Sequence, residues 1–356
     1  MSLSVTDKAA ERAVVRVSSP GFLTPYPAIH NRHFIPDKTR EFLEFGWKQG
    51  HIPEKEIQFI HLKQVFVVKE GLVFDASLNL VKQSVTQHSM QECEDGLAQI
   101  KASRNSGGIP TYSGLSVLCK KRGAWNYGHW LVEMLPKTLL AREALAGLPL
   151  RYAVASPPGR IASIMKECLD RAKFDSNQII WLQDGVAFFH DLILVDGMTQ
   201  HGEYISPLAI EHLQALKARI DRGSSTKIYV TRKNCPYRRF VNEEEIEGIA
   251  SNLGYTVVDV GTLSFKEQIS LFMGARQIAG VIGAGFTNAV FSDPWSVMKL
   301  FVPPEMVDRF FWLIGAIKPH FYVEMRCHAV LPKTGPADWD TDLYLKPSVV
   351  QAFLAE

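Results

Sequence analysis

The sequence has little cysteine, almost no net charge and no long apolar run, and each shortage excludes a class of protein. The five cysteines are scattered, form no C-x-x-C pair and are odd in number, so we expect reduced thiols rather than a disulfide scaffold. A formal net charge of +2 over 356 residues is too small to indicate a nucleic-acid binder. The longest apolar stretches have strand length and are broken by charge, as in VAFFHDLILVDGM, so no transmembrane segment is expected.

Several catalytic signatures are also missing. The sequence has no P-loop, no G-x-S-x-G elbow and no histidine or cysteine spacing typical of zinc, and we therefore expect no bound metal. It has no internal repeat and no low-complexity tract. The first 17 residues lack the apolar core of a secretory signal, which favours a cytoplasmic protein.

The composition is that of an ordinary globular protein, with 46% hydrophobic and 21% charged residues, and the length suggests two domains. We expect an irregular, proline-containing N-terminal segment over residues 1–55 that packs on the first domain. The first domain is expected over residues 56–222 and the second over residues 223–330, after the polar linker DRGSST. Residues 331–356 are expected to form a tail that crosses back to the first domain.

The fold class follows from the order of the expected elements. After strands or hairpins over residues 58–81 and a polar loop over residues 82–112, strand and helix patterns alternate from residue 116 onward. The alternation begins again at residue 227 and continues to residue 325. Such alternation predicts parallel sheets covered by helices, so we expect an α/β protein with two Rossmann-like, doubly wound domains that face a cleft.

A glycine-rich turn, GVIGAGFTNAVF over residues 280–291, joins an expected strand to a short helix. A dinucleotide fingerprint needs a third small residue where this sequence has Asn288, and it belongs after the first strand of a domain rather than a late one. A nicotinamide- or flavin-dependent enzyme is therefore disfavoured. The turn by itself is equally compatible with a tight backbone turn and with a phosphate held on exposed N–H groups.

A basic loop, TRKNCPYRRF, follows the strand that starts the second alternation. It contains Arg232, Lys233, Arg238 and Arg239, and guanidinium groups match phosphate oxygens well. A solvated charge cluster balanced by nearby glutamates is the alternative. Because the loop and the glycine turn follow strands of the same expected sheet, they could converge on one anion.

The third candidate is the segment NYGHWLVEMLPK, which reads as the start of a helix. His129 and Glu133 are four residues apart and share a helix face. A histidine oriented by a carboxylate is a suitable general base, although a histidine satisfied by the backbone is the commoner case. The acidic pairs of DWDTD, residues 338–342, lie outside the expected core strands and are interpreted as a charged loop.

Together these segments resemble the family-61 glycosyltransferases. NYGHWLVEMLP is similar to the family's N-Y-x-H-W-L-x-[DE]-x-L-P, and TRKNCPYRRFVNEEEI to its arginine segment followed by N-E-x-E. SFKEQISLF and IGAGFTN are similar to its S-F-x-E-Q-x-x-L-F and H-G-A-G-x-T-N. The order and spacing agree over roughly residues 112–325.

The resemblance implies a GT-B-type fold and an inverting, metal-independent transfer of a sugar from a nucleotide donor, a UDP-sugar above all, to a glycan or glycolipid acceptor. That activity fits the synthesis of cell-surface polysaccharide in the cytoplasm, with peripheral association at the inner face of the membrane. It implies no separate cofactor. The donor's diphosphate and nucleoside would contact the basic loop, the glycine turn and one glutamate: Arg232, Arg238, Arg239, Glu267, Gly283, Ala284, Gly285, Thr287 and Asn288.

By the same resemblance, His129 and Glu133 would face the acceptor and carry the catalytic proton transfer. One position departs from the family pattern, because Ile282 stands where a histidine is common. Isoleucine cannot donate a hydrogen bond to a departing phosphate. A catalytically inactive member that binds a nucleotide sugar or glycan as a scaffold is therefore the alternative function.

Overall fold

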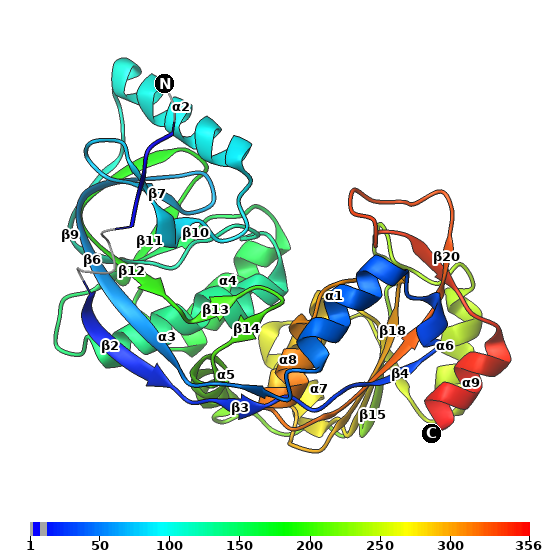
Figure 1. Ribbon diagram of the computed structural model, residues 1–356. Helices are drawn as coiled ribbons and strands as arrows, with labels where there is room; N and C mark the ends of the chain where they lie inside the picture. Colours follow the sequence, from blue (N-terminus) through cyan, green and yellow to red (C-terminus); the bar gives the residue numbers. More distant parts are fainter. Residues whose placement is uncertain (1–2, 8–12) are drawn as a thin grey trace. The chain divides into compact units, whose positions relative to one another are not determined.

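The computed structural model describes residues 3–7 and 13–356, and these fall into two compact units. Unit 1 combines the described residues up to Pro20 with Glu54–Leu216, and unit 2 combines Gly21–Pro53 with Lys217–Glu356. Each unit has a sheet of its own with helices packed on it, as Figure 1 shows. The expected α/β class is confirmed.

The sheet of unit 1 is mixed, with the strand order β1-β8-β7-β6-β12-β9-β10-β11 and β2 paired to β6. The strands are β1 (Val5–Thr6), β2 (Ala13–Ser19), β6 (Lys55–Val68), β7 (Leu72–Phe74), β8 (Leu80–Val81), β9 (Thr111–Leu118), β10 (Arg151–Ala155), β11 (Ile179–Leu182) and β12 (Val186–Asp196). The path β12-β9-β10-β11 runs parallel, as does the pair β1 and β8, while β6 is antiparallel to both β12 and β2. The expectation of a doubly wound first domain is therefore wrong in part, because the N-terminal strands join the same sheet.

The helices of unit 1 include one that the sequence analysis missed. They are α2 (Met90–Ser106), α3 (Leu135–Ala144), α4 (Arg160–Arg171) and α5 (Pro207–Gln214). The expected loop over residues 82–112 contains α2, which starts with a capping box between Ser89 and Glu92. Its buried face, with Leu97 and Ile100, packs in a cluster with apolar residues of β6 and β7. The helix was missed because so few of its residues are apolar.

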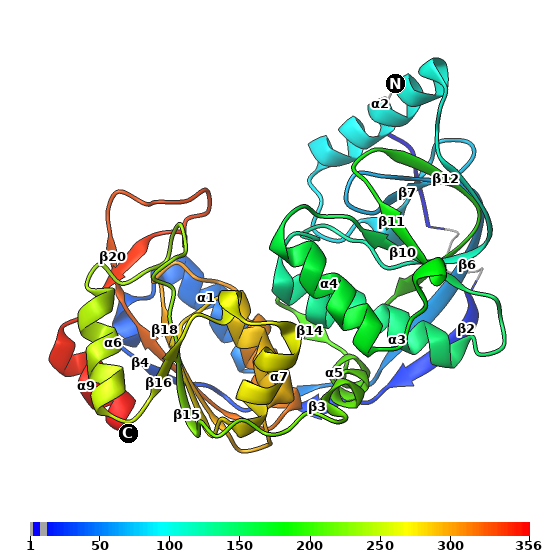
Figure 2. The ribbon, with the colours of Figure 1, turned by 180° about the vertical axis from the view of Figure 1, so that it is seen from behind.

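Unit 2 has a fully parallel sheet with the order β16-β15-β17-β18-β19-β4. Its strands are β4 (Ala28–His30), β15 (Lys227–Val230), β16 (Thr256–Val258), β17 (Gln277–Val281), β18 (Val297–Val302) and β19 (Phe321–Arg326). The helices are α1 (Asp37–Trp47), α6 (Glu243–Asn252), α7 (Phe265–Gly274), the 3₁₀ helix η8 (Ala284–Phe291), α8 (Phe310–Ile317) and α9 (Pro347–Ala355). Figures 1 and 2 show α6 and α9 on one face of this sheet and α1, α7 and α8 on the other.

Both ends of the chain differ from expectation in the unit they join. Of the expected N-terminal segment, residues 1–2 and 8–12 lie outside the described residues, and residues 21–53 belong to unit 2, where β4 pairs with β19. Pairing β4 there satisfies the backbone groups along the β19 edge. Residues 331–356 also belong to unit 2, because Phe353 and Leu354 of α9 are part of its apolar core.

Within the described residues, no helix has the length and apolar composition needed to cross a bilayer. The longest, α2, has 17 residues and a polar exposed face.

Candidate active site

His129 and Glu133 lie on a widened helical turn in unit 1. Residues His129–Met134 form the π-helical turn η4, which continues directly into α3. Pro136 stands in the first turn of α3 and has no N–H to donate back to the preceding turn, which favours the wider winding there. Single π-helical turns of this kind are frequent at functional sites.

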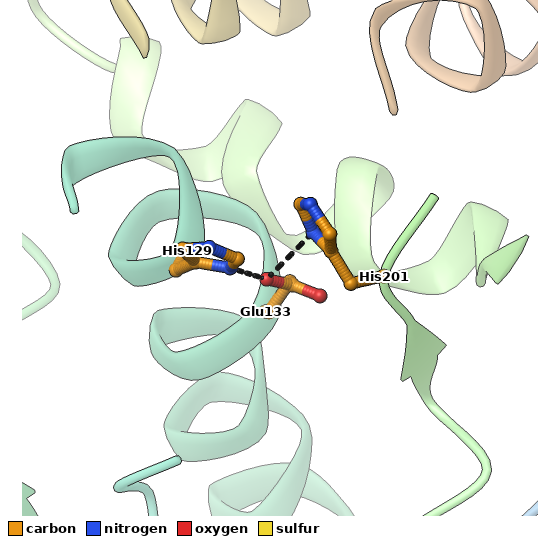
Figure 3. A group of neighbouring side chains, drawn as sticks. All are labelled: His129, Glu133 and His201. Atoms are coloured by element: carbon orange, nitrogen blue, oxygen red, sulfur yellow. Dashed lines mark hydrogen bonds and ion pairs between the residues drawn. The ribbon is translucent and has the colours of Figure 1, made fainter. Parts of the chain in front are cut away.

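Three basic side chains lie close to one carboxylate oxygen of Glu133. The carboxylate is fully buried, and its Oε2 accepts a short hydrogen bond from His129 Nδ1. Lys121 Nζ lies 2.9 Å from the same oxygen and His201 Nδ1 lies 3.5 Å from it. Figure 3 shows both imidazole rings turning one nitrogen toward this carboxylate. The ring centroids of His129 and His201 are 4.4 Å apart.

Charge is balanced locally in this cluster of Lys121, His129, Glu133 and His201, which we call the Glu133 cluster. Burial raises the pKa of Glu133, but the hydrogen bonds from His129 and His201 and the Lys121 charge outweigh it and hold that pKa well below its usual value. Burial, together with the charges of His201 and Lys121, lowers the pKa of His129 more than the hydrogen bond and charge of Glu133 raise it. His129 is therefore neutral near pH 7, with its proton on Nδ1 and a lone pair on Nε2, as a general base requires.

The absence of a side chain at Gly123 leaves room for the His129 ring. A Cβ atom at Gly123 would lie 2.6 Å from His129 Cδ2, and Gly123 has a φ of +85°, which a residue with a side chain rarely adopts. A glycine is therefore needed for the imidazole to lie against this turn.

The same groups are close enough to hold a metal ion. The ligand atoms of His129, Glu133 and His201 all lie within 4.8 Å of one another. The lysine ammonium already supplies positive charge at the Glu133 oxygen, and a divalent cation there would repel it. The donor set therefore fits a proton-transfer cluster better than a metal centre.

In unit 2 the basic loop and the glycine turn leave the sheet side by side. The strand order places β15 next to β17, with β16 on the far side, so the winding of the sheet reverses between β15 and β17. Val230, the last residue of β15, pairs with Gly280 of β17. Ligands of such sheets bind at the carboxyl ends of the strands, at the point of reversal.

Arg232 occupies this point. Its guanidinium donates through Nε to the carbonyl of Arg238 and through Nη2 to the carbonyl of Tyr237, both at 3.0 Å. Within the described part of the chain no carboxylate forms an ion pair with it. Burial and the Arg238 charge lower the pKa of Arg232, in keeping with a positive charge that lacks a counter-ion. Its Nη1 would clash with a Cβ atom on Gly283, so the guanidinium lies in this place because residue 283 is a glycine.

Arg238 and Arg239, in contrast, have acidic partners that the sequence analysis interpreted only as a charged loop. Arg238 Nε lies 3.3 Å from Asp340 Oδ1, and Arg239 Nη2 lies 3.4 Å from Asp342 Oδ2. Asp342 also accepts from the Arg239 backbone N–H at 3.1 Å. The segment DWDTD therefore folds back onto the basic loop, through contacts about 100 residues apart in the chain that spacing alone does not reveal.

The predicted donor-binding residues of the glycine turn separate into two groups. Gly283, Ala284 and Gly285 lie at the start of η8, beside Arg232. Thr287 and Asn288 are fully buried, and the Asn288 amide donates to Gln268 Oε1 at 2.9 Å. Both side chains therefore lie inside the turn, where Thr287 Oγ1 has no hydrogen-bond partner among the described residues. Their contact with a ligand stays a prediction.

The side chains of Glu267 and Ile282 both have structural roles. Glu267 is exposed at the start of α7, where its carboxylate caps the helix by accepting from Ser264. The Ile282 side chain is 1% exposed and packs in the core. Its backbone carbonyl faces Arg238 Nη1 at 3.5 Å. The position where a histidine was expected by resemblance thus contributes its backbone to the basic loop.

His201 was missed as a site residue. It follows β13 (Thr199–Gln200) in the polar turn TQHGE before β14 (Tyr204–Ile205), far from His129 in the sequence. The one available signal was a histidine in a glycine-containing turn just after an apolar strand.

A comparison with protein-family models places one match on these residues. The model described as Glycosyltransferase 61 matches residues 127–298, which include the π-helical turn, His201, the basic loop and the glycine turn. A search of curated proteins found no match.

Proposed function

We propose that this chain, whose residues 127–298 match the model described as Glycosyltransferase 61, is a family-61 glycosyltransferase. It moves a sugar from a nucleotide-sugar donor, a UDP-sugar above all, onto a glycan or glycolipid acceptor with inversion at the anomeric carbon. The GT-B-type fold, independence of a metal ion, a role in cell-surface polysaccharide synthesis and a cytoplasmic location at the inner membrane face belong to the same proposal.

The observation that carries the donor assignment is the uncompensated guanidinium of Arg232. Arg232 is partly buried, and a partly buried guanidinium with no carboxylate partner among the described residues is stabilised when an anion binds it. This one lies against Gly283, at the winding reversal of a parallel sheet. A diphosphate supplies the missing charge, and the backbone N–H groups at the start of η8 supply further donors.

The chemistry of transfer requires charge neutralisation on the leaving group. The acceptor oxygen forms a bond to the anomeric carbon while the bond from that carbon to the diphosphate oxygen breaks, and the diphosphate leaves with the electron pair. The transition state has oxocarbenium character, as in glycoside hydrolysis. Arg232, with Arg238 beside it, is proposed to stabilise the negative charge that develops on the diphosphate.

The proton of the acceptor hydroxyl needs a base, and His129 is the proposed one. Its Nδ1–H is held by Glu133, which leaves Nε2 as the acceptor of the proton. The Glu133 carboxylate stabilises the imidazolium that forms, in the manner of the carboxylate in a serine-protease triad.

Nucleotide binding tests the proposal. UDP is expected to raise the melting temperature of the wild-type protein, and Arg232→Gln is expected to abolish that shift. Arg276→Gln is the matched control, because Arg276 lies just before β17 at the opposite edge of the same sheet and pairs with Asp293. If UDP, GDP, CMP and TDP all leave the melting temperature unchanged, the donor site is assigned wrongly.

A further inference from the structure

A cavity of about 570 Å³ lies beside the Glu133 cluster, within unit 1. Lys121 and His201 both line it. The cavity therefore reaches the proton-transfer cluster through the second imidazole and the lysine. Its volume is in the range of small-molecule sites in proteins.

Contacts within the wall tie the cavity to the cluster. Lys121 Nζ lies 2.9 Å from Glu133 Oε2 and 3.3 Å from Gln87 Oε1, and Gln87 is itself a lining residue. His201 Nδ1 faces the same carboxylate, as Figure 3 shows. A molecule in the cavity would therefore lie next to groups already held by Glu133.

The lining is polar and carries both hydrogen-bond donors and acceptors. Lysine and amide donors line it together with the carboxylates of Asp7, Asp196 and Glu203, and Val85 is the one branched aliphatic side chain among the residues that line it. An acyl chain would leave these groups without hydrogen-bond partners. A sugar hydroxyl both donates and accepts, so a saccharide can satisfy donors and acceptors in one wall.

We propose that this cavity binds the saccharide part of the acceptor, and that His201 positions the acceptor hydroxyl next to His129. The inference rests on the proposed function and deepens it by naming the acceptor site and its substrate class. His201 acts as a positioning residue: its Nδ1 lies 3.5 Å from Glu133 Oε2, and its ring centroid lies 4.4 Å from that of His129. Both rings share one carboxylate, so an acceptor held by one is brought to the other.

Direct binding is the first test, because it does not depend on donor chemistry. Full-length protein labelled with ¹⁵N-histidine is titrated with the methyl glycosides of glucose, galactose, mannose and xylose, and with 1-hexanol as an apolar probe. The His201 ring signals, identified by their loss in His201→Gln, are expected to shift with at least one glycoside. No shift with any glycoside, or a shift with 1-hexanol alone, overturns the proposal.

Blocking the cavity is the second test. Thr199→Trp fills it from β13, and Thr111→Trp places the same side chain in a different cavity of unit 1 as the matched control. Thr199→Trp is expected to abolish the glycoside-induced shift while keeping the UDP thermal shift and the hydrolysis of UDP-sugar by water. Thr111→Trp is expected to keep all of them. A normal glycoside titration in a folded Thr199→Trp protein contradicts the assignment.

Kinetics separate positioning from catalysis. With the glycoside that binds as acceptor, His201→Gln is expected to raise the acceptor KM about tenfold, which corresponds to about 1.4 kcal/mol, with a much smaller change in kcat. His129→Gln is expected to lower kcat instead. An unchanged acceptor KM in His201→Gln refutes the positioning role. Failure of UDP binding or UDP-sugar turnover in the wild-type protein would refute the proposed function, whereas the glycoside titration would still report on the cavity.

Discussion

Replacing Glu133 with glutamine removes one buried negative charge and keeps the shape of the side chain. Glu133 is 0% exposed and Lys121 is 5% exposed, so the lysine would be left as a buried charge without its partner. Breaking a buried pair from one side typically costs about 3–5 kcal/mol. For a unit of this size that corresponds to a fall in melting temperature of about 6–20 °C.

The double variant Lys121→Met/Glu133→Gln is the control for this reasoning. If the cost comes from the stranded ammonium, removing the lysine as well should recover about 1–3 kcal/mol relative to the sum of the single variants. Urea unfolding followed by circular dichroism measures all four proteins. A loss below about 1 kcal/mol in Glu133→Gln, or strict additivity in the double variant, would refute the view that Glu133 is the counter-ion of Lys121.

The stability difference between the wild-type protein and Glu133→Gln should also depend on pH, in a direction that the pKa of Glu133 determines. The folded-state pKa of Glu133 is held well below its usual value. Its contribution to stability is therefore fully present above the unfolded value of about 4.3 and is lost as the pH falls toward the folded pKa. The stability gap between the wild-type protein and Glu133→Gln should be constant from neutral pH down to that value and should narrow below it. A gap that widens in acid would contradict the assignment.

The remaining predictions concern the catalytic base, the glycine turn and the acidic segment. His129→Ala should lower kcat by about 10²–10⁴-fold while the UDP thermal shift persists. Normal turnover in this variant would exclude His129 as the base. Absence of turnover in the wild-type protein would favour the alternative of an inactive scaffold. The acid limb of the kcat/KM profile of the wild-type protein should lie below the usual histidine pKa of about 6.5, since burial lowers the pKa of His129 in the free protein. An acid limb above that value would contradict this assignment. Gly283→Ala should displace the Arg232 guanidinium and weaken UDP binding. The loss of stability should be small, because the atom that the new Cβ meets lies at the end of the flexible Arg232 side chain. Unchanged UDP affinity would argue against the donor site. Asp340→Asn should weaken the placement of Arg238 and reduce UDP affinity several-fold, and an increase would indicate that Asp340 competes with the diphosphate. Treatment with EDTA should leave turnover unchanged, and restoration of lost activity by a divalent ion would make the Glu133 cluster a metal site.

Most of the second half of the chain could be predicted because its signals are local. The alternation from residue 227 to residue 325 appears in the structure as β15, α6, β16, α7, β17, η8, β18, α8 and β19. The Ser264 capping box and the apolar strands depend on residues a few positions apart, and these are the patterns that sequence reasoning detects. The placement of Arg232 beside Gly283 followed from the rule that parallel strands end at one edge.

The features that the sequence did not predict depend on packing between distant parts of the chain. The helix α2 was hidden because its buried face is narrow, although its Ser89–Glu92 capping box was visible in the sequence. The burial of Thr287 and Asn288 was not predicted, because it depends on the helices packed around η8; their contact with a ligand stays a prediction. Whether a polar side chain points into the core or toward a ligand is decided by packing, which spacing does not encode.

The sequence by itself determined the α/β class, the parallel alternation of unit 2, and the residue types available for anion binding and proton transfer, because hydrophobic periodicity and turn chemistry act over a few residues. Only the tertiary structure decided which of these residues meet. It brought His201 to the carboxylate that holds His129, although 72 positions separate the two histidines in the chain, and it folded Asp340 and Asp342 onto Arg238 and Arg239. Charges so far apart in the chain meet only after burial of the apolar core has fixed the backbone, and their pairing is therefore a consequence of the fold.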